Sequence, residues 1–251
     1  MSIENRILIL GYSIFAGNKE FFANGFTGVI NTLNPHSYIL ARNDELFCDA
    51  LKASDLLIPD GVGIKYAARL LAGKRIEKIA GADLHEIITR SLNTRAGSCF
   101  YLGSTEETLQ RIKEKMARDN PETRVETYSP PFRETFREGE NNEMIMAVNS
   151  FSPDVLFVGM TAPKQEKWVH KNRDKLNVPL ICSIGAVFDF YAGTVQRSGK
   201  FWISMGLEWL PRLFCEPRRL WRRNFVSTPL FLWYLFVEKA KRALGPGRSE
   251  G

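Results

Sequence analysis

The sequence predicts an α/β fold, in which a parallel β-sheet is flanked by helices on both faces. Short apolar runs alternate with longer segments of helical periodicity through most of the 251 residues. Because these runs are apolar throughout rather than at every second position, they indicate strands that are buried on both sides. Hydrophobic residues make up 44% of the chain and charged residues 25%, a balance that excludes a disordered or collagen-like protein.

Seven strands and six helices are expected, and they alternate as in βαβ units. The strands are predicted at 6–11, 29–33, 56–59, 98–103, 125–128, 155–159 and 180–184. The helices are predicted at 37–52, 63–71, 84–93, 106–119, 143–150 and 164–175. In an open sheet of this kind, ligands bind beyond the carboxyl ends of the strands. The residues that follow each strand are therefore the first candidates for a functional site.

The chain carries few signs of a membrane span, a leader or a metal centre. The longest apolar run, Pro229–Val237, has nine residues, about half of what a spanning helix requires. Residues 1–20 lack the basic and small-residue features of a signal peptide. The three histidines are scattered and the four cysteines form no C-x-x-C, so we expect reduced thiols and no metal.

Positive charge is concentrated at the C-terminal end. Residues 197–251 hold 11 basic and 4 acidic side chains, a net charge of +7, whereas residues 1–196 carry −1. Large aromatic residues such as Trp202, Trp209 and Trp221 are interleaved with this charge. The pattern is typical of a surface that lies on anionic lipid headgroups. The same composition also suits single-stranded nucleic acid, or an arginine-rich helix packed on its own protein.

Two strand ends offer phosphate sites at helix N-termini. Gly103-Ser104 and Gly159 end expected strands just before expected helices, and such N-termini bind anions. A dinucleotide fingerprint is excluded, because Tyr66 stands where the third glycine of G-x-G-x-x-G belongs. No P-loop motif and no D-x-D motif occurs, which argues against a metal-bridged nucleotide-sugar.

Polar side chains at two other strand ends suggest catalysis on a sugar. Asp60 follows an apolar strand and could act as a general base, or as the N-cap of the next helix. Asp83 is expected to be a helix cap. Thr32 and Asn34 could hydrogen-bond a sugar, although Asn34-Pro35 is also a common start of a turn.

Cationic and amide side chains complete the set of candidates. Lys164 could meet a phosphate. Gln165 and Glu166 could bind ribose or uracil edges, or could be plain first-turn residues of a helix. Helical spacing brings Arg212, Arg219 and Arg222 to one face. Like charges this close repel unless an anion neutralises them, and guanidinium groups bind a diphosphate in bidentate fashion.

Taken together, these blocks resemble the WecG/TagA/CpsF glycosyltransferases (glycosyltransferase family 26). The resemblance extends from about residue 29 to about residue 225. The matching stretches are TLNP at 32–35, IPDGVG at 58–63, GADL at 81–84, YLGS at 101–104, VGMTAPKQEKW at 158–168, IGAVFD at 184–189, and GLEW, RL and EPRR between 206 and 219.

This resemblance implies a Rossmann-like core with a C-terminal membrane-associating appendage. Such enzymes move a sugar from a UDP-sugar, with inversion and without a metal, onto a sugar carried by a polyprenyl diphosphate. The sugar is N-acetylmannosamine, its uronic acid, or glucose, and the product is a bacterial cell-surface polysaccharide. The implied location is the cytoplasmic side of the plasma membrane, with peripheral attachment through the appendage.

Functional residues follow from the resemblance by position. Asp60 falls on the catalytic base, Thr32 and Asn34 on the acceptor-side or sugar-side pocket, and Gln165 on the nucleotide-sugar loop. Lys78 falls on a phosphate contact, and Arg212, Arg219 and Arg222 fall on the appendage arginines that stabilise the leaving diphosphate. The strand-end candidates Gly103, Ser104, Gly159 and Lys164 complete the expected substrate contacts. Lys78 is a departure, because the family usually has arginine there. Lysine keeps the positive charge but cannot make the bidentate hydrogen bonds of a guanidinium group.

The expected division is a catalytic core over 1–195 and a basic appendage over 196–251. The expected partners are a UDP-sugar, a polyprenyl-diphosphate-linked acceptor and an anionic membrane; no cofactor and no nucleic acid is expected. The sequence leaves homo-oligomerisation open. A membrane-attached, non-catalytic nucleotide-binding module is the alternative hypothesis.

Overall fold

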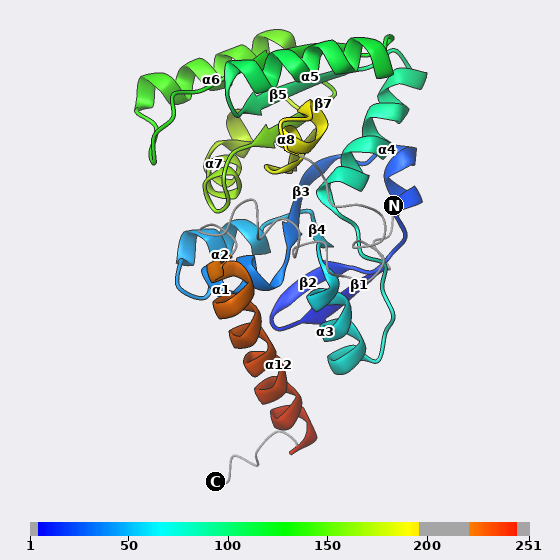
Figure 1. Ribbon diagram of the computed structural model, residues 1–251, viewed down its shortest axis with the longest axis vertical. Coiled ribbons are helices and arrows are strands. Elements are labelled where there is room, and N and C mark those ends of the chain that lie inside the picture. Colours follow the sequence, from blue (N-terminus) through cyan, green and yellow to red (C-terminus); the bar gives the residue numbers. More distant parts are fainter. Residues whose placement is uncertain (1–4, 196–220, 245–251) are drawn as a thin grey trace.

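The computed structural model describes residues 5–195 and 221–244, in which a six-stranded parallel sheet forms the centre (Figure 1). The order across the sheet is β4-β3-β8-β7-β5-β6. The strands are β3 (Gly28–Leu33), β4 (Leu56–Pro59), β5 (Ser98–Gly103), β6 (Arg124–Tyr128), β7 (Val155–Gly159) and β8 (Leu180–Ser183). All neighbouring strands run parallel, which confirms the predicted α/β fold.

Helices cover both faces of this sheet. Side chains of Ile30 and Cys182 join a cluster with α4 (Gly81–Thr94), α5 (Glu106–Asp119) and α8 (Val187–Ala192). Val29 and Ile181 point the other way, toward α6 (Glu138–Phe151) and α7 (Lys164–Asn172). Further along that second face, Leu33 packs on α1 (Pro35–Ala41) and α2 (Glu45–Lys52). This two-sided burial explains why the inner strands are mostly apolar, whereas the edge strand β6, with the sequence RVETY, is only half-buried and carries polar residues.

The single helix expected over 37–52 is wrong, because the chain forms α1 and α2 instead. Asp44 is the N-cap of α2, and its side chain accepts a hydrogen bond from Phe47 N at 3.1 Å. Such a cap fixes a new helix start and interrupts the old helix. The helix expected over 164–175 also ends sooner, since α7 stops at Asn172 and a 3₁₀ turn, η2 (Arg173–Lys175), follows.

The first expected strand lies outside the parallel sheet. β1 (Arg6–Ile9) pairs antiparallel with β2 (Tyr12–Phe15), a strand that the sequence analysis did not predict. The two connecting residues, Leu10 and Gly11, have φ of 50° and 84°. Two residues of positive φ make the tight hairpin turn whose twist matches that of the strands. A 3₁₀ turn, η1 (Lys19–Asn24), then leads into β3.

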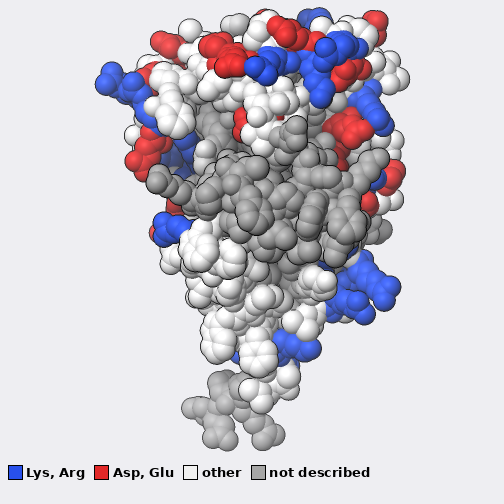
Figure 2. Space-filling model, viewed as in Figure 1, with Lys and Arg blue, Asp and Glu red and all other residues white. Residues whose placement is uncertain are grey.

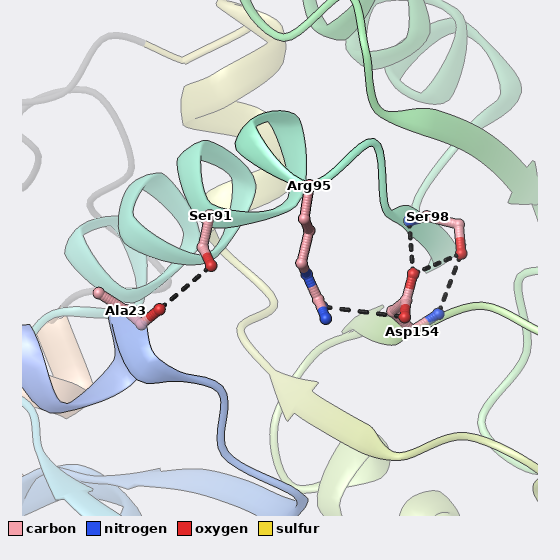
Figure 3. A network of polar contacts seen from close by, with 5 residues as sticks. All are labelled: Ala23, Ser91, Arg95, Ser98 and Asp154. Atoms are coloured by element: carbon pink, nitrogen blue, oxygen red, sulfur yellow. Dashed lines mark hydrogen bonds and ion pairs between the residues drawn. The ribbon is translucent and has the colours of Figure 1, made fainter.

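A polar network ties β5 and β7 together at the amino-terminal edge of the sheet (Figure 3). Asp154 Oδ2 accepts hydrogen bonds from the backbone N of Ser98 at 2.7 Å and from its hydroxyl at 2.9 Å. The hydroxyl oxygen in turn accepts from Asp154 N at 3.1 Å. Arg95 approaches the same carboxylate at 3.9 Å. These bonds fix the register of two central strands at their amino-terminal ends, on the opposite edge of the sheet from their carboxyl ends.

The C-terminal segment packs back onto the sheet core. A π-helical turn, η3 (Arg222–Ser227), leads into α12 (Thr228–Ala243), which contacts α1 and α3 (Val62–Ala72). Phe231 and Leu235 are buried there, and the Phe231 ring meets Tyr38 edge-on with 5.4 Å between centroids. The apolar run 229–237 therefore divides, one side joining the core and the other facing out. Among the helices of 5–195 and 221–244, none has the length and apolar character to cross a membrane.

Candidate active site

The parallel sheet gathers the predicted strand-end residues along one edge. Going across the sheet, Asp60 follows β4, Asn34 follows β3, Gly185 follows β8, Gly159 ends β7 and Gly103 ends β5. This is the edge at which open α/β sheets bind ligands. The site can be described in two halves, one around β3 and β4 and one around β8, β7 and β5.

Asp60 lies half-buried between two chain segments at the end of β4. Its backbone N donates to Leu33 O at 2.9 Å. The N-cap of α3 is Gly61, at φ 92° and without a side-chain cap, so Asp60 is not the N-cap that was one reading of its position. Ile79 N donates to Pro59 O at 3.0 Å, which brings the backbone of half-buried Lys78 beside the Asp60 loop.

Thr32 and Asn34 stand next to Asp60, at the end of β3. Thr32 is in register with Ile58 of β4 and is half-buried. The Asn34 side-chain oxygen accepts from the backbone N of His36 and Ser37, at 3.0 Å each, and so caps α1. Asn34 is therefore the N-cap of a helix, in place of the simple turn that Asn34-Pro35 suggested. Its Nδ2 is the part of the side chain that the cap does not use.

The start of the C-terminal segment meets the same corner. His36 Nδ1 and Ser227 Oγ are 2.8 Å apart. Burial, together with the positive charges of Arg223 and Arg222, lowers the pKa of His36 to about 4. The two arginines therefore lie close enough to the β3–α1 loop to act on its charge. Arg212 and Arg219, the other expected cations, lie outside the described residues.

Glycines at the other half allow the strand ends to touch backbone to backbone. A Cβ on Gly103, whose φ is 123°, would overlap the carbonyl oxygen of Gly159, and a Cβ on Gly159 would overlap the Phe188 ring. Ser104 follows at φ 60°, and its carbonyl accepts from Ser129 Oγ at 2.8 Å. Close packing is therefore enough to explain why glycine occupies both positions. The phosphate contact that the sequence suggested is a separate role.

Lys164 holds a neighbouring loop. Its ammonium group donates to Arg133 O and lies 3.8 Å from the centre of the Phe136 ring. Burial lowers the pKa of Lys164. Both partners belong to the loop between β6 and α6, which the sequence analysis did not connect with the site. Lys164 thus fixes this loop beside the first turn of α7. A phosphate bound by its ammonium group would share that group with the carbonyl oxygen of Arg133.

Gln165 joins the ends of β7 and β8. Its side-chain oxygen accepts from Met160 N at 3.2 Å and from Gly185 N at 3.1 Å, and its amide nitrogen donates to Glu166 Oε1 at 2.9 Å. The residue is buried, so its amide positions two loops of the site through their backbone. Gly185 leaves room for this, since a Cβ there would come 2.7 Å from the Gln165 oxygen.

Glu166 is a buried carboxyl group beneath these loops. It is 2% exposed, and its Oε2 has no hydrogen-bond partner within the described parts of the chain. Burial raises the pKa of Glu166 to about 7, against a lowering by the Gln165 bond. Glu166 was a candidate for a ribose or uracil contact, but its burial was not expected, because a glutamate in the first turn of a polar helix is ordinarily solvated.

No group of three or more histidine, cysteine or acidic side chains within 5–195 and 221–244 is placed to hold a metal ion. Among the described residues, Lys78, Arg222 and Arg223 are cations near the β3–β4 corner.

Comparison with known proteins gives one consistent result. The sequence profile of the glycosyl transferase WecG/TagA/CpsF family matches residues 14–245. A Bacillus subtilis (strain 168) protein is 26% identical over 228 residues, which cover 91% of this chain and 87% of that protein. A Bacillus spizizenii relative is 28% identical over 203 residues, covering 81% and 76%. A Staphylococcus aureus (strain NCTC 8325) relative is 24% identical, covering 90% and 86%. All three are named N-acetylglucosaminyldiphosphoundecaprenol N-acetyl-beta-D-mannosaminyltransferase.

Proposed function

The chain belongs to the glycosyl transferase WecG/TagA/CpsF family, and from that premise we propose that it transfers N-acetylmannosamine from UDP to a lipid-linked sugar. The acceptor is N-acetylglucosamine carried on a polyprenyl diphosphate. The names of the relatives support the transferred sugar and the acceptor, and the sequence motifs support UDP as the carrier. The product is an intermediate of a bacterial cell-surface polymer.

The observation that carries this proposal is the convergence of three segments at one corner of the sheet. The Asp60 loop, the Asn34 loop and the start of the C-terminal segment meet there: Ser227 bonds His36, and Phe231 lies 3.6 Å from where a Gly63 Cβ would stand. A carboxylate, an amide and two guanidinium groups are thus held in one region. These are the groups that a reaction between a hydroxyl and a sugar diphosphate requires.

In the proposed reaction, Asp60 removes the proton from the acceptor hydroxyl. The hydroxyl oxygen forms a bond to the anomeric carbon on the face opposite UDP, and the bond from that carbon to the diphosphate oxygen breaks. The configuration is inverted, the proton stays on Asp60, and the electron pair leaves with UDP. Cations such as Arg222 stabilise the charge that develops on the leaving oxygens, a role in which one preorganised donor is worth about 3 kcal/mol.

The other assignments are part of the same proposal. Thr32 and the Asn34 amide bind the sugar, whereas Gln165 acts indirectly through the loops that it joins. We assign diphosphate contacts to Lys78, Gly103, Ser104, Gly159, Lys164, Arg212, Arg219 and Arg222. The cationic side chains take the place of a metal ion. A core over 1–195 would bind the nucleotide-sugar, and the appendage over 196–251 would attach it to the cytoplasmic side of the plasma membrane.

A UDP-release assay over a panel of UDP-sugars tests this function. We expect release only when UDP-N-acetylmannosamine and a short-chain lipid-diphosphate-N-acetylglucosamine are both present, and we expect chelation of divalent metals to leave the rate unchanged. Binding of UDP without release from any donor would contradict the proposal and favour the non-catalytic nucleotide-binding module. Release from another donor would keep the reaction and change the transferred sugar.

A further inference from the structure

Exposed apolar side chains gather on two elements of the structure. Within the described residues, fourteen large apolar side chains are exposed, and eleven of them belong to α3 or to residues 221–244. Those of 221–244 are Trp221, Phe225, Val226, Leu230, Leu232, Trp233, Phe236 and Leu244, and those of α3 are Val62, Tyr66 and Leu70. An apolar surface of this extent marks an interaction site. The part on α3 was not expected, because the sequence pattern pointed only to the C-terminal end.

The helices α3 and α12 lie side by side along their length (Figure 1). At one end, a Cβ on Gly63 would stand 3.6 Å from the Phe231 ring. At the other end, Arg242 Nη1 donates to Leu71 O at 3.1 Å. Tyr66 and Leu70 follow Gly63 at intervals of three and four residues, and so lie on the side of α3 that borders α12. The exposed apolar side chains of both helices therefore belong to one surface, the α3–α12 face.

Positive charge surrounds this face. Residues 62–78 contain five basic residues and one acidic residue, and residues 221–244 contain the same numbers. The exposed basic residues are Lys65, Arg69, Lys74, Arg75, Arg222, Lys239, Lys241 and Arg242. Of the two acidic residues, Glu238 is neutralised by Arg242 at 2.9 Å. In Figure 2 the lower part of the molecule shows white and blue side chains, whereas the acidic ones in view lie in the upper part.

We propose that α3 lies on the anionic membrane surface together with the C-terminal segment, so that the sheet core itself contacts lipid through the α3–α12 face. Tryptophan and tyrosine rings prefer the headgroup level, and lysine and arginine side chains around them bind anionic lipids. A protein partner of acidic character would fit the charge equally, but exposed tryptophans inside a basic rim favour lipid.

This contact deepens the proposed function and rests on it, because it places the chemistry at the membrane. α3 begins at Val62, two residues after Asp60. A helix fixed on the headgroups would hold the proposed base at the level where a lipid-linked diphosphate presents its sugar. Membrane contact at α3 would then orient the site toward the acceptor, whereas the appendage alone would only tether it.

Vesicle binding by the full chain tests the proposal. The variant Lys65→Glu/Arg69→Glu removes two cations of α3 that take no part in the proposed chemistry. The matched control is Arg111→Glu/Arg118→Glu on α5, where the same charges are exposed far from α12 (Figure 1). Vesicles of phosphatidylcholine, with and without phosphatidylglycerol, are the probe. Each basic residue near an anionic surface contributes about five-fold in affinity, so we expect the α3 variant to bind anionic vesicles at least about twenty-fold more weakly.

The control should bind within about three-fold of the wild type. We expect the α3 variant to keep turnover with a short-chain, water-soluble acceptor and to lose it with an acceptor embedded in vesicles. Equal vesicle binding by wild type and α3 variant would overturn the proposal, as would an equal loss in the control. The proposal would also be overturned if the wild type were a dimer, if Tyr66→Ser/Leu70→Ser made it a monomer, and if this variant bound vesicles as the wild type does. The α3–α12 face would then be an interface between two copies of the chain. Absence of transfer from every donor, with vesicle binding as expected, would refute the function and leave the docking surface standing.

Discussion

Glu166 makes the stability of this protein depend on pH in a predictable direction. Burial raises the pKa of its carboxyl group from 4.5 to about 7 in the folded chain. Below pH 4.5 the group is protonated in both states and carries no penalty. Between pH 4.5 and 7 the unfolded chain releases the proton while the folded chain keeps it, so stability falls as pH rises, and the loss is complete above the folded pKa.

The size of the effect follows from the shift. One pKa unit corresponds to 1.36 kcal/mol, so a shift from 4.5 to 7 amounts to about 3 kcal/mol at full ionisation. Glu166→Gln keeps an oxygen that can accept from the Gln165 amide but has no proton to lose. We therefore expect the stability advantage of the variant over the wild type to be small at pH 5 and to grow by about 2 to 3 kcal/mol as the pH rises to 8.

Urea unfolding of both proteins at each pH measures this difference. Comparing the two at the same pH removes the contribution of other groups, such as His36 and His85, whose pKa values burial lowers to about 4 and about 3. Those histidines favour folding above pH 6.5 and disfavour it as pH falls, which is opposite in sign to Glu166. A difference between the proteins that stays constant from pH 5 to 8 would refute the reasoning.

Two further results are expected from the packing of the C-terminal segment. Phe231→Ala should lower the free energy of unfolding by about 3 to 5 kcal/mol, because the ring is fully buried. Phe236→Ala, on the exposed side of the same helix, should change it by less than about 0.5 kcal/mol. Equal effects of the two substitutions in thermal unfolding would contradict the orientation of α12. Arg223→Ala should raise the pKa of His36 in an NMR titration, because a nearby positive charge is removed, and an unchanged pKa would mean that the segment does not reach the β3–α1 loop.

The sheet could be predicted because its strands are buried on both faces. For the runs at 56–59, 98–103 and 155–159 the predicted and observed bounds agree, since these strands are buried along their whole length and consist mostly of apolar residues. The hairpin of β1 and β2 was missed because its turn depends on positive φ at Leu10 as well as Gly11, and leucine is no signal for such a turn. The break between α1 and α2 depends on one cap at Asp44, which the surrounding helical periodicity obscures.

The site was predictable where it depends on position along the chain. Asp60, Asn34 and Gly103 are at strand ends in the sequence, and a parallel sheet necessarily brings such ends to one edge. What the sequence could not give was the partner of each side chain. The amide of Gln165 bonds two loops and a buried carboxyl group, a set of contacts between residues that only the packing of α7 brings together.

The most direct test of the catalytic proposal is the turnover of Asp60→Asn with UDP-N-acetylmannosamine and a lipid-diphosphate-N-acetylglucosamine acceptor, measured beside the affinity of the same variant for UDP. Asparagine keeps the shape of the side chain and cannot accept the proton as aspartate does. The account predicts that turnover falls by about 10² to 10⁴-fold while UDP binds within about two-fold of the wild type. Turnover near that of the wild type, with UDP binding intact, would contradict it.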